Sequence, residues 1–207
     1  NKRIGNVGQA CTSNKRMIVM EDIYDEFVAE LVAIAESYTQ GDPLNPGENE
    51  YYPLSSRDAA EKLAQQLKIA VDAGATLHTG GQVEGEGAYF TPAVITGIPV
   101  GSDSYYEEYF GPVAEVYKVS SEEEAIEVAN DSNYGLGGAV MSEDTERAKR
   151  VANKIVTGMI HVNIPQARGA ELPFGGVKNS GIGRELGPLG MDEFVNKQRF
   201  FIADEDK

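Results

Sequence analysis

The sequence is poor in the features that disulfide-bonded and membrane-spanning proteins require. It has one cysteine and no tryptophan among 207 residues, and a single cysteine cannot form a disulfide within the chain. No apolar run reaches about 18 residues, the length that crosses a bilayer. No charged-then-apolar leader opens the chain. We therefore expect a protein of the reducing cytoplasm without a membrane span.

Positive charge is also scarce. The chain has 18 lysine and arginine residues against 33 aspartate and glutamate residues, which gives a formal net charge of −15. Binding to nucleic acid or to an anionic membrane surface requires clustered lysine and arginine. We expect neither as a partner. The 41% of hydrophobic residues is ordinary for a globular protein with a buried core.

The one cysteine lies in a polar turn that contains glycine, Asn6-Val7-Gly8-Gln9-Ala10-Cys11-Thr12-Ser13. A lone cysteine is most often a small, buried and inert hydrophobe. A nucleophile instead needs a loop that exposes its sulfur and turns a backbone N–H toward a developing oxyanion. The turn favours Cys11 as a nucleophile, with the inert thiol as the alternative.

Short apolar runs alternate with amphipathic helical patterns along the chain. The predicted strands cover 15–20, 76–78, 93–98, 113–119, 136–141, 159–162 and 198–202. The predicted helices cover 21–38, 56–73, 121–131, 143–157 and 187–195. This alternation predicts an α/β fold with a mostly parallel, twisted sheet flanked by helices.

Three helix starts and one helix face are specific enough to be checked. Caps are predicted just before three helical patterns: at Ser55 or Ser56, at Ser120 and Ser121 ahead of Glu123 and Glu124 as a capping box, and at Ser142. In the first helix the apolar residues recur at helical spacing and are predicted to be core. They are Ile23, Phe27, Leu31, Ile34 and Tyr38.

The stretch 163–180 is punctuated by proline and glycine and is predicted to be irregular. Loops of this length within a domain are usually functional or disordered. Arg168, in its middle, is either exposed to solvent or binds the carboxylate of a substrate. The following glycines at 181–187 superficially resemble a dinucleotide-binding pattern, but no strand leads directly into them.

The two histidines offer weak candidates. His78 has no cysteine, histidine or carboxylate at metal-binding spacing, so no metal site is predicted. His161 lies in an apolar strand, where a core histidine is the default. A Cys11–His161 pair, the basis of a cofactor-free thiol hydrolase, requires that the fold join the two.

An acidic and aromatic stretch, 105–112, ends in Gly111-Pro112 just before a predicted strand. Carboxylates such as Glu107 and Glu108 can accept hydrogen bonds from sugar hydroxyls, and an aromatic side chain can support a flat ring. An acidic patch at a helix end is the alternative interpretation.

Three of these segments occur in a characteristic order: 8–11 with Lys15-Arg16, then 107–113, then 173–185. Together with 133–136, they resemble the aldehyde dehydrogenase superfamily over essentially the whole chain. The resemblance implies that Cys11 adds to an aldehyde to form a thiohemiacetal. A hydride then passes to NAD or NADP, and water hydrolyses the thioester.

The resemblance also implies further roles. The Cys11 backbone N–H would form half of an oxyanion hole, Glu108 would bind the hydroxyls of the nicotinamide ribose, and Phe110 would lie against that end of the cofactor. Leu54-Ser55-Ser56-Arg57 is similar to succinate-semialdehyde dehydrogenases, whose substrate carboxylate Arg168 would meet. Departures from the family pattern are Gly5, Tyr52 and Tyr109.

In this family the cofactor domain, the glutamate that activates water and an oxyanion-hole asparagine all precede the cysteine. We therefore expect 1–196 to be a catalytic-domain fragment with little turnover alone, and 197–207 to be an oligomerisation strand with an acidic tail. The full-length protein would be a homo-oligomer. A non-catalytic assembly fragment with an inert thiol is the alternative.

Overall fold

The computed structural model describes residues 3–167 and 169–203, and it confirms the predicted α/β class. The larger sheet contains β1 (Arg16–Met20), β8 (Val113–Val119), β7 (Ala93–Thr96) and β4 (Thr76–Thr79), in that order. β1, β8 and β7 run parallel, whereas β4 is antiparallel to β7. A second, parallel pair joins β10 (Gly137–Val140) to β11 (Met159–Val162).

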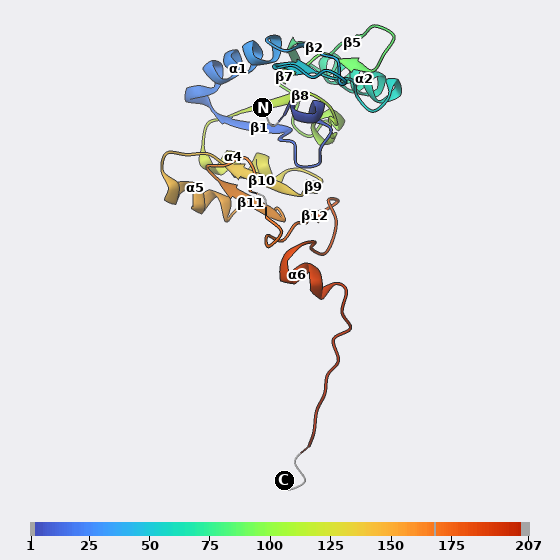
Figure 1. The fold of residues 1–207 in the computed structure, drawn as a ribbon. Helices are drawn as coiled ribbons and strands as arrows, with labels where there is room; N and C mark the ends of the chain where they lie inside the picture. The colour runs from blue at the N-terminus through green and yellow to red at the C-terminus, as the bar shows by residue number, and fades with distance from the viewer. Residues whose placement is uncertain (1–2, 168, 204–207) are drawn as a thin grey trace.

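The longer helices are α1 (Glu21–Glu36), α2 (Arg57–Asp72), α4 (Glu122–Asn130) and α5 (Thr145–Ala152). The short elements are η1 (Gly5–Gly8), α3 (Asp103–Tyr106), α6 (Gly187–Asp192), β2 (Thr39–Gln40), β3 (Glu50–Tyr51), β5 (Val83–Glu84), β6 (Tyr89–Phe90), β9 (Tyr134–Gly135) and β12 (Val177–Lys178). Figure 1 shows their arrangement, with the segment after α6 running away from the rest of the molecule.

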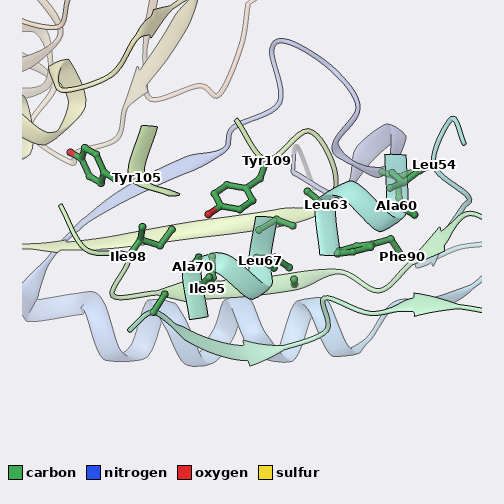
Figure 2. Close-up of a cluster of buried hydrophobic side chains, with 14 of the residues drawn as sticks. Leu54, Ala60, Leu63, Leu67, Ala70, Phe90, Ile95, Ile98, Tyr105 and Tyr109 are labelled. Carbon is green, nitrogen blue, oxygen red and sulfur yellow. The ribbon is translucent and has the colours of Figure 1, made fainter. Parts of the chain in front are cut away.

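The two faces of the larger sheet have separate cores because successive side chains of a strand point to opposite faces. On β7, Val94 belongs to the cluster that includes Val28 of α1, whereas Ile95 belongs to the cluster formed with α2. Figure 2 shows the second cluster, in which Leu63 and Leu67 of α2 gather with Phe90, Ile95 and Tyr109. α1 and α2 therefore cover opposite faces of the sheet.

The predicted core face of α1 is only partly correct. Ile23 and Ile34 are 52% and 46% exposed, while Val28 and Ala35 are buried. Phe27 and Leu31 pack against the cluster from its edge. The reason is that this side of α1 borders a cavity of about 900 Å³ that separates it from β10 and β11.

Two of the three predicted helix caps are confirmed. The Ser56 hydroxyl accepts a hydrogen bond from the Ala59 N–H, and the Ser121 hydroxyl accepts one from the Glu124 N–H, both at 3.1 Å. The Glu124 carboxylate in turn accepts from the Ser120 N–H at 2.7 Å. A capping box would have Glu124 accept from the N–H of the cap Ser121 itself, so the predicted box is only partly formed.

The third predicted cap, Ser142, is wrong. Asp144 caps α5 by accepting from the Arg147 N–H at 2.9 Å, and Ser142 accepts from the Asp144 N–H instead. α5 also ends at Ala152, before the predicted limit at Gly158. An aspartate at this position adds a negative charge at the helix N-terminus, where the helix dipole favours it.

The C-terminal part differs from prediction in two respects. The stretch 163–180 is mostly irregular as expected, but Val177 and Lys178 form β12 and pair antiparallel with β9. No strand forms over 198–202. An isolated strand leaves its backbone groups unpaired, and this segment has no strand beside it among the described residues.

No helix in the described ranges is both long enough and apolar enough to cross a membrane.

Candidate active site

The Cys11 turn precedes β1, and Cys11 is exposed. Its path depends on Gly8, which has a φ of +70°. A Cβ atom at Gly8 would lie 2.1 Å from the carbonyl oxygen of Gly111, so only glycine permits this approach. The turn therefore lies directly against the 107–113 segment.

Local hydrogen bonds hold the turn in place. The Gln9 side-chain oxygen accepts from the Ser55 N–H at 2.8 Å, which ties the turn to the loop before α2. The Asn6 amide donates to the Gln9 carbonyl at 3.1 Å, and the Ser13 N–H donates to the Ala10 carbonyl at 3.0 Å. The turn is thus fixed on both sides of Cys11 while the sulfur stays exposed.

Lys15 connects the predicted site residues. Its ammonium lies 3.3 Å from the carbonyl oxygens of Ala10 and Cys11 and 3.0 Å from Oε1 of Glu108. It also lies 5.4 Å from the centre of the Phe110 ring, within the range of a cation–π interaction. The fold therefore brings Cys11, Glu108 and Phe110 to one place, with Lys15 between them.

Glu107 and Glu108 point to different partners, and Glu108, the one to which the resemblance gives a role, faces the cysteine turn. Glu107 accepts a hydrogen bond from the Gln66 amide at 2.6 Å and so faces α2. Glu108 faces the cysteine turn through its Oε1 atom. Among the described residues, its Oε2 atom has no hydrogen-bond partner.

The sequence analysis missed a buried arginine below the site. Arg3 is 4% exposed, and its guanidinium donates to the carbonyls of Val113 and Tyr109 and to the Ser13 hydroxyl. Desolvation lowers the pKa of Arg3 to about 10, while Glu115 and Glu108 act in the opposite direction. Arg3 thereby joins the base of the Cys11 turn to the start of β8.

A second missed feature is the charged layer around Glu115, which is 1% exposed. Desolvation raises the pKa of Glu115 to about 7, although the Tyr117 hydroxyl donates to it at 2.9 Å and Arg3, Arg16 and Lys15 favour its charged form. The Arg16 guanidinium lies over both the Tyr105 and the Tyr117 ring, 4.9 and 5.0 Å from their centres. No local sequence pattern predicts this layer. Glu115 and Arg16 are far apart in the chain and lie opposite each other only because of the register of β1 and β8.

The other candidates do not join this group. His161 lies 3.1 Å from the Gly138 carbonyl through its Nδ1 atom. It borders the same cavity as Cys11, but among the described residues no contact joins His161 to Cys11. Arg168 lies outside the described residues. His78 binds the Thr96 hydroxyl at 2.8 Å. The described residues contain no group of three possible metal ligands.

The arrangement suits a ligand with a diol and a flat ring. Oε2 of Glu108 can accept from a hydroxyl while Oε1 stays with Lys15. The Phe110 ring is 45% exposed and can support a planar group. The Cys11 N–H has no acceptor among the described residues, so it can donate to an oxyanion.

Comparison with known proteins agrees with these features. A family model described as the aldehyde dehydrogenase family matches residues 1–200. The chain is 49% identical over 197 residues to a succinate-semialdehyde dehydrogenase [NADP(+)] from Deinococcus radiodurans, covering 95% of the chain and 41% of the relative. Succinate-semialdehyde dehydrogenase [NADP(+)] 1 from Mycobacterium ulcerans is 42% identical to it, over 97% of the chain and 44% of the relative.

Solved structures give the same result. Succinic semialdehyde dehydrogenase from Streptococcus pyogenes, in complex with NADP+, has a TM-score of 0.93 and 48% identity, covering 98% of this chain and 45% of that one. Betaine aldehyde dehydrogenase from Staphylococcus aureus, in complex with NAD+, has a TM-score of 0.87 and 36% identity, covering 93% and 40%. The chain thus spans less than half the length of these relatives.

Proposed function

The chain belongs to the aldehyde dehydrogenase family, and from this premise we propose that it supplies the catalytic cysteine of an enzyme that oxidises an aldehyde to a carboxylic acid with NAD or NADP. The observation that carries the proposal is the junction of the exposed Cys11 turn with Glu108 and Phe110 through Lys15. An inert core thiol would not be exposed at such a junction.

In the proposed reaction the Cys11 thiolate adds to the aldehyde carbon, and the carbonyl π electrons move to oxygen. The resulting oxyanion accepts a hydrogen bond from the Cys11 N–H. A bound nicotinamide cofactor would supply the acceptor for the hydride that leaves this carbon. Cys11 then carries a thioester, and attack by water releases the carboxylic acid and returns the thiol.

The cofactor residues of this chain are Glu108 and Phe110. Glu108 accepts hydrogen bonds from the ribose hydroxyls next to the nicotinamide, through the oxygen that Lys15 leaves without a partner in the described part of the chain. Phe110 supports the same end of the cofactor with its exposed ring. Relatives described with NADP+ and with NAD+ support either cofactor.

The proposed substrate is succinate semialdehyde, which carries a carboxylate as well as the aldehyde. The support is the description of the Deinococcus radiodurans and Mycobacterium ulcerans relatives. Arg168, although outside the described residues, is the proposed partner of that carboxylate because guanidinium groups bind carboxylates in a bidentate manner.

We further propose that 1–196 acts as a catalytic domain of a cytoplasmic homo-oligomer and that 197–207 forms its oligomerisation strand and acidic tail. The family match over 1–200 supports the first assignment. The exposure of Phe200, Phe201 and Ile202, between 73% and 83%, supports the second. Such a cluster gains free energy when a partner covers it.

The test replaces the matching part of the Deinococcus radiodurans relative with these 207 residues and measures NAD(P)H production from succinate semialdehyde. We expect Cys11→Ala to reduce the rate by about 10³-fold or more, because no other group replaces the nucleophile. The 207-residue chain by itself should give little or no turnover.

Thermal melting of the Cys11→Ala graft serves as the control and should match that of the parent graft, because Cys11 is exposed. A folded Cys11→Ala graft that retains full NAD(P)H production would refute the proposal. So would a folded parent graft that oxidises no aldehyde.

A further inference from the structure

Resting on the proposed function, we propose that Lys15 is a positioning residue that fixes the Cys11 turn relative to Glu108. It sets the placement of the nucleophile against the carboxylate that binds the cofactor ribose.

The geometry of Lys15 matches such a role. The Lys15 ammonium donates hydrogen bonds to the carbonyls of Ala10 and Cys11 and forms an ion pair with Oε1 of Glu108. The first two belong to the turn that holds the sulfur, and the third belongs to the cofactor side. A single side chain therefore spans two segments that are distant in sequence.

Among the ion pairs of the described residues, this one has the most buried cation. The Lys15 side chain is 13% exposed, and that of Glu108 is 34% exposed. In contrast, the Arg57–Glu61 and Lys68–Asp72 pairs lie within α2 and are 41% to 71% exposed. Exposed ion pairs contribute little to the free energy of unfolding. A largely buried ammonium needs its partners, because an unpaired buried charge is costly in free energy.

The Phe110 ring adds a further constraint because it lies 5.4 Å from the same ammonium. Lys15 thereby touches the nucleophile turn, the carboxylate and the aromatic ring at once. Its two hydrogen bonds to the Ala10 and Cys11 carbonyls hold the backbone that carries the thiol. Loss of Lys15 should therefore change the reactivity of Cys11 as well as the placement of Glu108.

The experiment measures the rate of Cys11 alkylation by iodoacetamide at pH 7 in the 207-residue chain. Lys15→Met should slow alkylation by about tenfold, because the turn that presents the thiol loses both of its hydrogen bonds to Lys15 and the link to Glu108. Lys15→Arg, which keeps the charge and the donors, should stay within about threefold of the parent.

The matched control is Lys118→Met. Lys118 also lies over an aromatic ring, that of Tyr24 at 5.2 Å, but makes no contact with the Cys11 turn. Lys118→Met removes the same charge and should leave the rate of Cys11 alkylation unchanged. Equal slowing by Lys15→Met and Lys118→Met would overturn the proposal, because net charge alone would explain it.

A double-variant cycle separates positioning from simple support of the turn. In a Glu108→Gln background, Lys15→Met should slow alkylation by less than about threefold, because the ion pair that orients Lys15 is already lost. A tenfold effect in both backgrounds would overturn the link to Glu108. If Lys15→Met no longer melts cooperatively, Lys15→Gln takes its place, since its amide still donates but carries no charge.

The alkylation assay needs no cofactor and no aldehyde, so its outcome is independent of the proposed oxidation. An active graft with unchanged alkylation in Lys15→Met would refute the positioning role alone. An inactive graft with the expected alkylation shifts would refute the oxidation alone.

Discussion

The larger sheet and the C-terminal stretch 163–203 differ in the burial of their apolar side chains. Around the sheet, Phe90, Ile95 and Tyr109 are fully buried. In the C-terminal stretch, Ile182 and Phe194 are at least 88% exposed. The sheet and its two helices therefore complete their own core, whereas the described C-terminal residues leave much apolar surface in contact with solvent.

The candidate site belongs to the first of these regions. Leu63 of α2 would be 2.2 Å from a Cβ atom at Gly111, and Gly111 in turn contacts Gly8 of the cysteine turn. The same packing that stabilises the sheet therefore places the site. Stability and site geometry should change together in this region and not in the C-terminal one.

The largest expected effect is that of Leu63→Ala. Leu63 is 2% exposed, so its truncation should lower the free energy of unfolding by about 2–5 kcal/mol through lost burial and a residual cavity. Urea unfolding followed by circular dichroism measures the change. Ile69→Ala on the same helix, at a residue that is 51% exposed, is the control, and an equal loss there would contradict the comparison.

Glu115→Gln is expected to have a smaller effect on the free energy of unfolding, and this effect depends on pH. The pKa of Glu115 rises from 4.5 to about 7 on folding, chiefly because of desolvation. The folded state therefore holds this proton more tightly than the unfolded state. The stability from this proton is fully present below pH 4.5 and is lost as pH rises through about 7.

In the parent chain this group should reduce the free energy of unfolding by about 3 kcal/mol at most between these pH values. Glu115→Gln should flatten that dependence while the amide oxygen still accepts from Tyr117. Urea unfolding at both ends of the window measures it. Glu86→Gln, in an exposed turn, is the control, and an unchanged slope in Glu115→Gln would show that Glu115 does not titrate there.

The smallest effect is expected in the C-terminal region. Phe194→Ser with Phe201→Ser should change the free energy of unfolding of the isolated chain by less than about 0.5 kcal/mol, because these side chains are 88% and 73% exposed. The same unfolding assay measures it. A loss near that of Leu63→Ala would mean that the C-terminal residues pack against the sheet region after all.

Local patterns predicted many of the elements. The limits of β8 and β11 agree with prediction, and Ser56 and Ser121 cap their helices. These features depend on residues close in sequence, such as the serine hydroxyl and the N–H three positions later. Ser142 failed for a local reason too, because Asp144 is a competing cap nearer to the helix.

Features that depend on distant partners were not predictable in this way. Whether Ile23 or Val28 of α1 is buried depends on where the helix meets the sheet. The strand predicted over 198–202 had the right composition but no partner among the described residues. Strand pairing and helix docking are set by long-range contacts that periodicity does not encode.

The fold class, the cysteine turn and the order of the motifs that carry the family resemblance could be predicted from the sequence, because each rests on residues that are neighbours along the chain. The position of Lys15 between the cysteine turn and Glu108, the contact of Glu107 with α2, and the burial of Glu115 among arginines and tyrosines came from the tertiary structure. These outcomes depend on the parallel register of β1 and β8 and on the contact of Gly8 with Gly111. Both join segments that lie far apart in the chain, and only packing of the whole domain brings them together.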